Sequence, residues 1–201
     1  MKKRISSIFC LLALAITSMQ AKDYNVKDYG AIGDGKTLDH IAINATIDTC
    51  VAHGGGRVVL PAGTYLCGSI RMKSNVELHL MTGSKILAAP ASMKAYDEAE
   101  KFEGTAYQDG GHTYFKNSLI YAIGANDVSI TGRGMIDGEG LTRRDTEKAG
   151  NLQGGNIGTG DKAIAFKQCR NILSRDVTVY RGGHFGIIVT GCELGTIDNV
   201  I

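Results

Sequence analysis

Residues 186–201 read GIIVTGCELGTIDNVI, and they repeat the pattern of residues 163–180, AIAFKQCRNILSRDVTVY, at an offset of 23 positions. Residues of like character coincide at this offset: Ile164 and Ile187, Phe166 and Val189, Cys169 and Cys192, Asp176 and Asn199, Val177 and Val200. A fixed period of this length, built from short apolar runs and turns, is typical of a solenoid, in which each repeat packs on the next. The repeat therefore predicts a stack of coils.

Two kinds of solenoid have a period near 23 residues. Leucine-rich repeats need a regular frame of Leu with an Asn, and the sequence lacks that frame. A parallel β-helix fits better, with successive coils roughly 4.8 Å apart through parallel strand pairing. A step of 44 residues back from Cys169 and Ile172 reaches Ala125 and Val128 in a comparable frame. Because 44 falls short of two full periods, an irregular coil is expected between them.

Two polar stretches, at about residues 91–117 and 139–161, lack the coil pattern and are predicted to leave it. The second contains GGNIGTGD at residues 154–161, which is similar to the Gly-Asp loops of calcium-binding β-helices. Those letters occur once and out of frame, so a flexible loop is the favoured interpretation.

One helix is expected, over residues 38–52. Thr37 and Asp39 offer capping side chains, and His53 with three following glycines ends the run. The apolar residues occupy most of the circumference, which predicts burial on more than one face. They lie on two sides: Leu38, Ile41 and Ala45 on one, Ile43, Ile47 and Val51 on the other.

Residues 1–21 form a different kind of segment. Basic residues at positions 2–4 precede the apolar run 8–16, and Ala21 is the small residue expected at a cleavage site. This is the pattern of a secretory signal peptide, and the run is too short to span a bilayer. We expect an exported protein, periplasmic or extracellular, with no transmembrane span and with residues 22–201 as part of one β-helix domain.

Charge argues against two classes of partner. Of 22 basic residues, three lie in the signal segment, which leaves 19 against 20 acidic residues in the mature chain. A net charge near −1 gives no electrostatic reason to expect nucleic acid or an anionic membrane as a partner.

The stretch GAIGDGKT, with Gly30 first and Thr37 last, matches the phosphate-binding pattern G-x-x-x-x-G-K-[ST]. Such a loop needs a buried strand before it and a helix that starts on it. Here no buried strand precedes the match, and Asp34 puts a negative charge where phosphates would sit. We therefore predict a structural turn and no nucleotide.

Four cysteines follow the signal segment: Cys50, Cys67, Cys169 and Cys192. An even count in an exported protein permits two disulfides, and Cys169 over Cys192 would stack in neighbouring coils. Their spacing matches neither a small disulfide scaffold nor a zinc site, so buried thiols are the favoured interpretation.

Two short motifs carry residue types that catalysis uses. Asp137 and Glu139, in MIDGEG, form a close carboxylate pair, and sugar hydrolysis needs two carboxyls about 5–9.5 Å apart. The glycines around them favour a simple turn. His184, in RGGHFGIIV, directly precedes a strand of the coil, where a turn residue is the favoured reading. The other histidines are scattered and are predicted at the surface or in turns: His40, His53, His79 and His112.

A series of motifs runs through the first third of the chain: DYGA at 28–31, GDG at 33–35, GGG at 54–56 and LPAGTY at 60–65. With the helix between them, they resemble the N-terminal segment of the pectate-lyase-like superfamily. In that superfamily G-A-x-G-D-G leads into a helix that caps the coil, which accounts for the P-loop-like letters. The resemblance implies an all-β, right-handed parallel β-helix with a short N-terminal capping α-helix.

Further motifs look like those of the polygalacturonases, family 28 of the glycoside hydrolases: MKSNVEL at 72–78, ITGRG at 130–134 and IDGEG at 136–140. This resemblance implies inverting hydrolysis of a pectic polysaccharide, a galacturonan or rhamnogalacturonan. One Asp would act as general acid and others would activate water, while Arg and Lys hold uronate carboxylates. The resemblance implies no metal and no other cofactor.

The catalytic motifs of that family, an N-T-D-type motif, an Asp pair, G-H-G and R-I-K, are not found in these residues. In the 23-residue frame, the strand that carries the first catalytic Asp would begin just after Ile201. We therefore expect no catalytic residue here, an N-terminal portion of a β-helix domain, and an inactive chain on its own. His184 and Phe185 are the two residues that we place near the substrate groove.

Three alternatives stay open. A polysaccharide lyase on the same fold would require acidic calcium ligands and a cationic base. A non-catalytic carbohydrate-binding or adhesin-type β-helix would retain oligogalacturonate without turnover, although the absence of Trp argues mildly against it. A gene fragment would have no function of its own.

Overall fold

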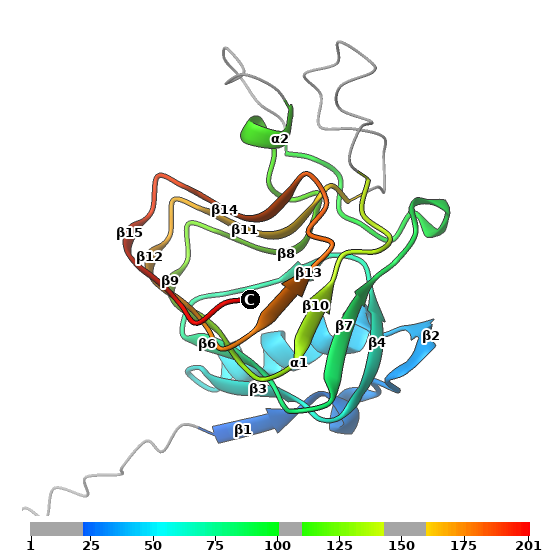
Figure 1. The fold of residues 1–201 in the computed structure, drawn as a ribbon. Coiled ribbons are helices and arrows are strands. Elements are labelled where there is room, and N and C mark those ends of the chain that lie inside the picture. Colours follow the sequence, from blue (N-terminus) through cyan, green and yellow to red (C-terminus); the bar gives the residue numbers. More distant parts are fainter. Residues whose placement is uncertain (1–21, 101–109, 143–159) are drawn as a thin grey trace, which may run out of the picture.

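The structure, a computed structural model, describes residues 22–100, 110–142 and 160–201. Its strands form three parallel sheets, which we call A, B and C (Figure 1). From β3 onward the chain visits A, then B, then C, and begins again on A, so neighbours within a sheet are one circuit apart; in the first circuit α1 follows the sheet B strand. This arrangement confirms the predicted right-handed parallel β-helix.

The strands have the following bounds. Sheet A contains β1 (Lys22–Asn25), β3 (Gly56–Leu60), β6 (Val76–Leu80), β9 (Asn126–Gly132), β12 (Arg170–Arg175) and β15 (Glu193–Asp198). Sheet B contains β2 (Asp34–Leu38), β4 (Gly63–Cys67), β7 (Ser84–Ala88), β10 (Met135–Asp137) and β13 (Thr178–Tyr180). Sheet C contains β5 (Ile70–Arg71), β8 (Ser118–Ile123), β11 (Lys162–Lys167) and β14 (Phe185–Thr190). The helical segments are η1 (Val26–Tyr29), α1 (His40–Ala52), η2 (Ala91–Met93) and α2 (Gly110–Thr113).

The strand register confirms the sequence repeat. Ile164 in β11 pairs with Ile187 in β14, at the predicted offset, and with Ile120 in β8 on its other side. The shared frame across the step of 44 residues is also confirmed, because Ile172 in β12 pairs with Val128 in β9. The irregular coil expected between them is wrong, however, since β9 and β12 are direct neighbours in sheet A and the extra residues form an excursion within a single coil. Since successive side chains of a strand alternate between its two faces, each such column runs straight through the interior. The inward columns make up the core.

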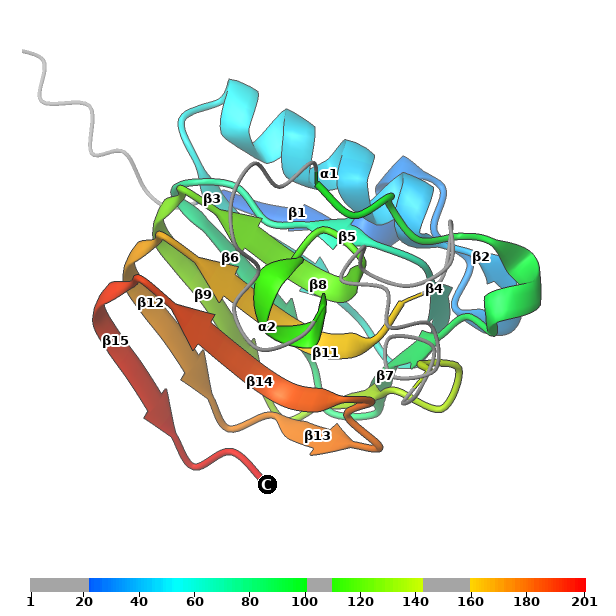
Figure 2. The same ribbon diagram turned by 90° about the horizontal axis from the view of Figure 1, so that it is seen from above.

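Helix α1 covers one end of this stack (Figure 2). Ile43, Ile47 and Cys50 are fully buried against the first coils. Ile41 and Val51, however, are 69% and 37% exposed, so the expected burial on more than one face is wrong. The helix lies on the end of the coil with only one side against it, and its opposite side has no second layer to contact.

The helix also begins later than predicted, at His40, because residue 38 completes strand β2. Asp39 does not cap the helix with its side chain. Instead its carboxylate accepts hydrogen bonds from the backbone N–H groups of Ile32 and Gly33, at 2.7 and 3.0 Å. The buried Asp39 therefore fixes the turn that leads into β2.

The P-loop-like stretch has the context of a turn followed by a strand. Thr37 lies in β2, and the helix starts three residues after it. The backbone N–H groups of Lys36 and Thr37 both donate to Asp34 Oδ1, at 2.8 Å. Amides that would cradle a phosphate are thus bonded to this chain's own carboxylates. The prediction of a structural turn is confirmed.

Cys50, Cys67, Cys169 and Cys192, the four cysteines that the structure describes, are free thiols, as favoured from the sequence. Cys169 and Cys192 do stack in neighbouring coils, with the Cys169 N–H at 3.3 Å from Cys192 Sγ. Burial raises the pKa of the Cys50, Cys67 and Cys169 thiols. These thiols therefore stay protonated and unreactive at neutral pH.

No helix in residues 22–100, 110–142 and 160–201 is long and apolar enough to cross a membrane. The predicted signal segment and most of the GGNIGTGD stretch lie outside those residues.

Among the residues that the structure describes, β15 is an edge strand of sheet A and pairs with β12 on one side. Its Ile197 sits in an inward column, in register with Ser174 of β12 and, beyond it, with Ile130 of β9. Ile197 is nevertheless 53% exposed, and Leu194 and Ile201 are exposed as well. An exposed strand edge with apolar inward positions favours pairing with another chain.

We expect residues 22–201 to self-associate through this edge, and Ile197→Lys to shift them toward the monomer, because a charge at an inward edge position opposes strand pairing. Sedimentation velocity measures both species. Ile41→Lys is the matched control, since it adds the same charge on the exposed side of α1 and should leave association unchanged. A sharp monomeric boundary for the unsubstituted chain would contradict this expectation.

Candidate functional site

The coil is interrupted at one corner. After β7 and after β10 the chain leaves the stack, and it returns at the starts of β8 and β11 in sheet C. The described parts of these two excursions, residues 89–100 and 110–117 and residues 138–142 and 160–161, contain no strand. Both predicted departures are therefore confirmed within those parts. The first meets the outer side of sheet C, where α2 also lies (Figures 1 and 2).

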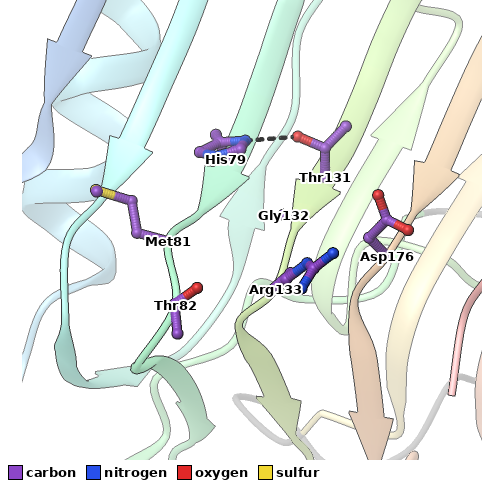
Figure 3. Close-up of a pocket in the computed structure, with 7 residues that line it drawn as sticks. All are labelled: His79, Met81, Thr82, Thr131, Gly132, Arg133 and Asp176. Carbon is purple, nitrogen blue, oxygen red and sulfur yellow. Dashed lines mark hydrogen bonds between the residues drawn. The ribbon is translucent and has the colours of Figure 1, made fainter.

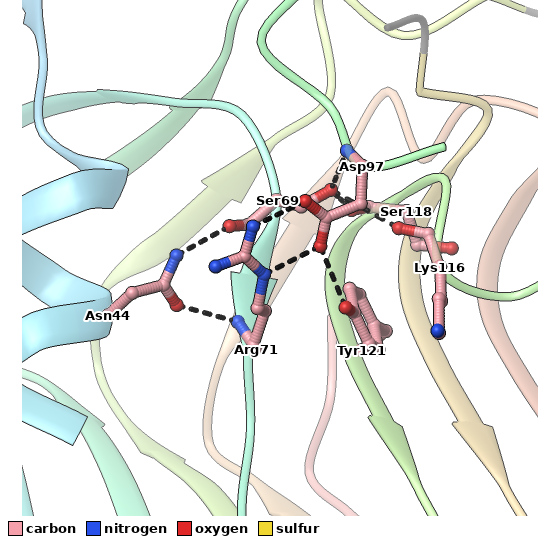
Figure 4. A network of polar contacts seen from close by, with 7 residues as sticks. All are labelled: Asn44, Ser69, Arg71, Asp97, Lys116, Ser118 and Tyr121. Carbon is pink, nitrogen blue, oxygen red and sulfur yellow. Dashed lines mark hydrogen bonds and ion pairs between the residues drawn. The ribbon is translucent and has the colours of Figure 1, made fainter. Parts of the chain in front are cut away.

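Asp97 anchors the first excursion to sheet C (Figure 4). Its carboxylate accepts two hydrogen bonds from the Arg71 guanidinium, at 2.7 and 2.5 Å, and one from the Tyr121 hydroxyl, at 2.7 Å. Burial raises the pKa of Asp97, but the bonds from Arg71 and Tyr121 outweigh it, and the net shift is below the ordinary value of 3.8. The ionised form is thus the one this site holds.

The same network continues into the capping helix. The backbone N–H of Asp97 donates to Ser69 Oγ at 3.0 Å, and the Asn44 side chain donates to the Ser69 carbonyl oxygen at 2.8 Å. Asn44 Oδ1 in turn accepts from the Arg71 N–H at 2.8 Å. Helix α1, strand β5 and the first excursion are therefore joined by one continuous set of hydrogen bonds (Figure 4).

Glu100 makes a second anchor further along the excursion. Its carboxylate accepts from the backbone N–H groups of Phe115 and Lys116, at 2.9 and 3.0 Å, and lies 3.3 Å from Lys167 Nζ. Burial raises the pKa of Glu100, whereas the two N–H groups and the Lys167 charge lower it, with a net shift below 4.5. Lys167 is the last residue of β11, so this contact ties the excursion to the middle of sheet C.

The outer face of sheet C has an apolar centre with a cation beside it. Tyr121, Ala165 and Ile188 are in register across β8, β11 and β14, and they form a cluster with Phe115 from the excursion. Lys167 Nζ lies 5.0 Å from the centre of the Phe115 ring. Its side chain remains 21% exposed, so this ammonium can reach a ligand on the face while it contacts Glu100.

His184 and Phe185 lie at the edge of this face, where β14 begins. Their rings meet edge to face at 4.4 Å, and His112 of α2 lies 4.9 Å from Phe185 and 6.2 Å from His184. The structure thus brings together the two residues predicted from the sequence and adds His112, which the sequence gives no reason to group with them. No local pattern links His112 to His184, because the excursion between β7 and β8 sets their contact. That they bind substrate stays a prediction.

A buried ion pair lies under the same edge. Lys162 Nζ is 2.5 Å from Asp161 Oδ1, and both side chains are almost fully buried. Asp161 Oδ2 has no hydrogen bond within the described part of the chain. Burial raises the pKa of Asp161, and Lys162 only partly offsets this. The backbone carbonyl of Asp161 accepts from the His184 N–H at 2.7 Å, so the pair also positions the start of β14.

The carboxylates of Asp137 and Glu139 do not form a free pair. Asp137 ends β10, is 2% exposed and accepts two hydrogen bonds from Arg181, at 2.8 and 2.7 Å. Glu139 lies in the turn and contacts the same guanidinium at 3.2 Å. Both carboxylates are therefore paired with Arg181, and Lys85 Nζ lies 3.8 Å from Asp137 as well. The turn interpretation is confirmed. No group of three or more His, Cys, Asp or Glu in the described ranges is placed to hold a metal ion.

Comparison with known proteins agrees with this geometry. Residues 24–200 match the family model described as rhamnogalacturonase A/epimerase, pectate lyase-like. The chain belongs to this family. It is 33% identical over 135 residues to the exo-poly-alpha-D-galacturonosidase of Dickeya chrysanthemi, a match that covers 63% of this chain and 21% of that protein.

Two further relatives show how widely the family's fold is used. The solved family 28 exopolygalacturonase of Yersinia enterocolitica superposes with a TM-score of 0.69 and 26% identity, over 90% of this chain and 38% of that one. Plasmin and fibronectin-binding protein A of Streptococcus pneumoniae is 32% identical over 180 residues, 87% of this chain and 23% of that protein. The polygalacturonase resemblance is thereby confirmed, and this rhamnogalacturonase-like chain spans well under half of these relatives.

The anchor at Asp97 generates a pH-dependent expectation. Because its pKa is lowered on folding, its contribution to stability is present above the ordinary value of 3.8 and is lost as pH falls through the folded-state value. We expect Asp97→Asn to lower the free energy of unfolding by about 2 kcal/mol at pH 7 and by much less at pH 3.

Urea unfolding at the two pH values measures the effect. Asp48→Asn is the matched control, because Asp48 pairs with Lys73 on the exposed side of α1, where an ion pair contributes about 0–1 kcal/mol. Equal losses at pH 7 from both substitutions would contradict the role of Asp97 as an anchor.

Proposed function

We propose that this chain is the N-terminal part of an exported, polygalacturonase-like hydrolase of pectic polysaccharide, and that the substrate lies along the outer face of sheet C. The likeness to a family 28 exopolygalacturonase, at 26% identity over 90% of the chain, carries this proposal. The relative from Dickeya chrysanthemi, which is named for the same polymer, supports it.

The chemistry of the sheet C face fits an acidic sugar chain. A galacturonan presents a carboxylate on each ring, and Lys167 offers a partly exposed ammonium for one of them. Phe185 is half-buried and can present a ring to a sugar, while His184 beside it can exchange hydrogen bonds with hydroxyl groups. Residues 184 and 185 are accordingly proposed as substrate-binding residues.

The acid and base of hydrolysis would come from elsewhere in the protein. Strands β8, β11 and β14 read SLIYAI, KAIAFK and FGIIVT, and none of them carries Asp or Glu. Inverting hydrolysis needs two carboxyls about 6.5–9.5 Å apart, on opposite sides of the bond that breaks. We propose that these belong to a strand of sheet C that neighbours β14, and that the 201 residues bind substrate without turning it over.

A second candidate is a binding β-helix without catalysis. The match to a protein named for binding plasmin and fibronectin, which covers 87% of this chain, favours it more than the sequence alone did. On this alternative the sheet C face would retain a polymer or a protein and no reaction would follow.

The expected outcome for the proposed function is that residues 22–201 retain oligogalacturonate without releasing reducing ends, while the product of the whole coding region releases them. Reducing-end assays and mass spectrometry of the products measure this. An unsaturated, ultraviolet-absorbing product would show a lyase instead. Retention without turnover by the longer product would favour the binding β-helix.

Lys167→Met should weaken trigalacturonate binding to residues 22–201 about tenfold, which corresponds to about 1.4 kcal/mol. Isothermal titration measures the change. Lys27→Met removes the same charge from η1, away from sheet C, and should change little. If both substitutions weaken binding equally, the sheet C face is not the binding site.

A further inference from the structure

A second surface site lies outside the face proposed for the substrate. At the ends of β6 and β9, on the outer side of sheet A, an open pocket of 410 Å³ faces solvent (Figure 3). Its volume lies within the range of about 300–1,000 Å³ that small-ligand sites occupy. It is lined by His79, Met81, Thr82, Thr131, Gly132, Arg133 and Asp176.

Arg133 is exceptional among the arginines that the structure describes. The other five each pair with a carboxylate: Arg57 with Asp23, Arg71 with Asp97, Arg170 with Glu193, Arg175 with Asp198, and Arg181 with Asp137 and Glu139. Arg133 has no hydrogen bond or ion pair within residues 22–100, 110–142 and 160–201, and it is exposed at the pocket. A guanidinium offers five donors in a planar fork that matches a carboxylate.

The backbone fixes where Arg133 stands. A Cβ at Gly132, whose φ is +101°, would lie 2.1 Å from the Leu80 carbonyl oxygen, and one at Gly134 would lie 2.4 Å from Ser84 Oγ. The two glycines therefore let this turn press against the previous coil. Arg133 is held between them on a rigid stack, with its side chain projecting into the pocket (Figure 3).

His79 is held in one tautomer on the same wall. The Thr131 hydroxyl donates its single hydrogen to Glu77 Oε1, so the Thr131 oxygen can only accept from His79 Nδ1, 2.8 Å away. Nδ1 must therefore carry the hydrogen, and Nε2 of the neutral ring is left as an acceptor. Within the described residues Nε2 makes no hydrogen bond, and the side chain is 27% exposed.

Asp176 faces Arg133 across the pocket without pairing with it (Figure 3). Its Oδ1 accepts from the Asn199 amide at 2.7 Å, and Oδ2 makes no hydrogen bond within the described ranges. Met81, which is 45% exposed, adds apolar surface to the wall. The pocket thus offers the Arg133 guanidinium as a cation, hydrogen-bond acceptors on Asp176 and His79, and the apolar surface of Met81.

We propose that this pocket is a second binding site for a uronic acid unit of an acidic polysaccharide. Arg133 binds the sugar carboxylate, Asp176 Oδ2 and His79 Nε2 accept from ring hydroxyls, and Met81 contacts the C–H face of the ring. A single negative charge with several hydroxyl donors fits this set. A phosphate dianion does not fit, because its second charge would meet Asp176 instead of another cation.

This site goes beyond the proposed function, since it lies on sheet A and takes no part in bond cleavage. A polymer held here and on sheet C at once would bind more tightly than at either face alone. The two sites can be separated by substitution, because no residue of the pocket contacts Lys167.

The test is titration of residues 22–201 with digalacturonate in the Lys167→Met background, which leaves the sheet A pocket intact. We expect weak residual binding that Arg133→Met reduces at least tenfold, and Asp176→Asn reduces about threefold. Arg57→Met is the matched control, because Arg57 is another exposed arginine of sheet A, already paired with Asp23, and its loss should leave binding unchanged.

Three outcomes overturn the proposal. Residual binding that survives Arg133→Met, or that falls equally with Arg57→Met, removes the assignment to the pocket. If a neutral galactose disaccharide binds as tightly as digalacturonate, Arg133 does not recognise the sugar carboxylate. If Lys167→Met alone abolishes all binding, this second site fails while the sheet C proposal stands; if Arg133→Met alone does so, the sheet C proposal fails and this one stands.

Discussion

Everything in this molecule depends on the register between successive coils. Each parallel pairing places a residue on its equivalent one circuit away, so an inward Ile120 meets Ile164 and then Ile187. Burial of one such side chain contributes about 1.5–3 kcal/mol, and a slip of one position would turn the whole column outward. The register is therefore strongly held, and it fixes the outward residues as firmly as the inward ones.

The outward residues are where function can vary, because they do not support the core. On sheet C the columns carry Tyr121, Ala165 and Ile188, with Lys167 next to them. The two excursions both leave at the corner between sheets B and C, and the described part of the first one lies against this face through Phe115 and Glu100. The attachment of this first excursion through Asp97 and Glu100 fixes its position, and the network extends to Asn44 of the capping helix.

Much of the fold could be predicted, since each coil of a β-helix places apolar residues at the same inward positions, and this leaves a repeat in the sequence. The offset of 23 residues and the two departures could be predicted from apolar spacing and from its loss. The step of 44 was in the right frame, but the coil expected within it does not exist, because spacing alone cannot distinguish two short coils from one coil with a long excursion. The site could be predicted only in part. His184 and Phe185 could be named as candidates because they adjoin a strand of the repeat, and their binding of substrate stays a prediction. Their neighbour His112 comes from the excursion, where no period exists. Ile41 of α1 was expected to be buried but is exposed. The spacing of apolar residues in a helix shows which sides are apolar, but it does not show whether another element packs against each of them.

The pairing of charges supplies information that the repeat cannot. In a solenoid the outward residues of neighbouring coils lie side by side, so an arginine can usually find a carboxylate one coil away, as Arg170 finds Glu193 and Arg175 finds Asp198. Such exposed pairs contribute little to stability, but they use the cation's hydrogen-bonding capacity. Arg133 has Asp176 within the same pocket and still does not pair with it. Most arginines of the described residues have a carboxylate partner in a neighbouring coil, so a guanidinium that has none among these residues is informative. Its donors remain available to a ligand, whereas the donors of the paired arginines are already used.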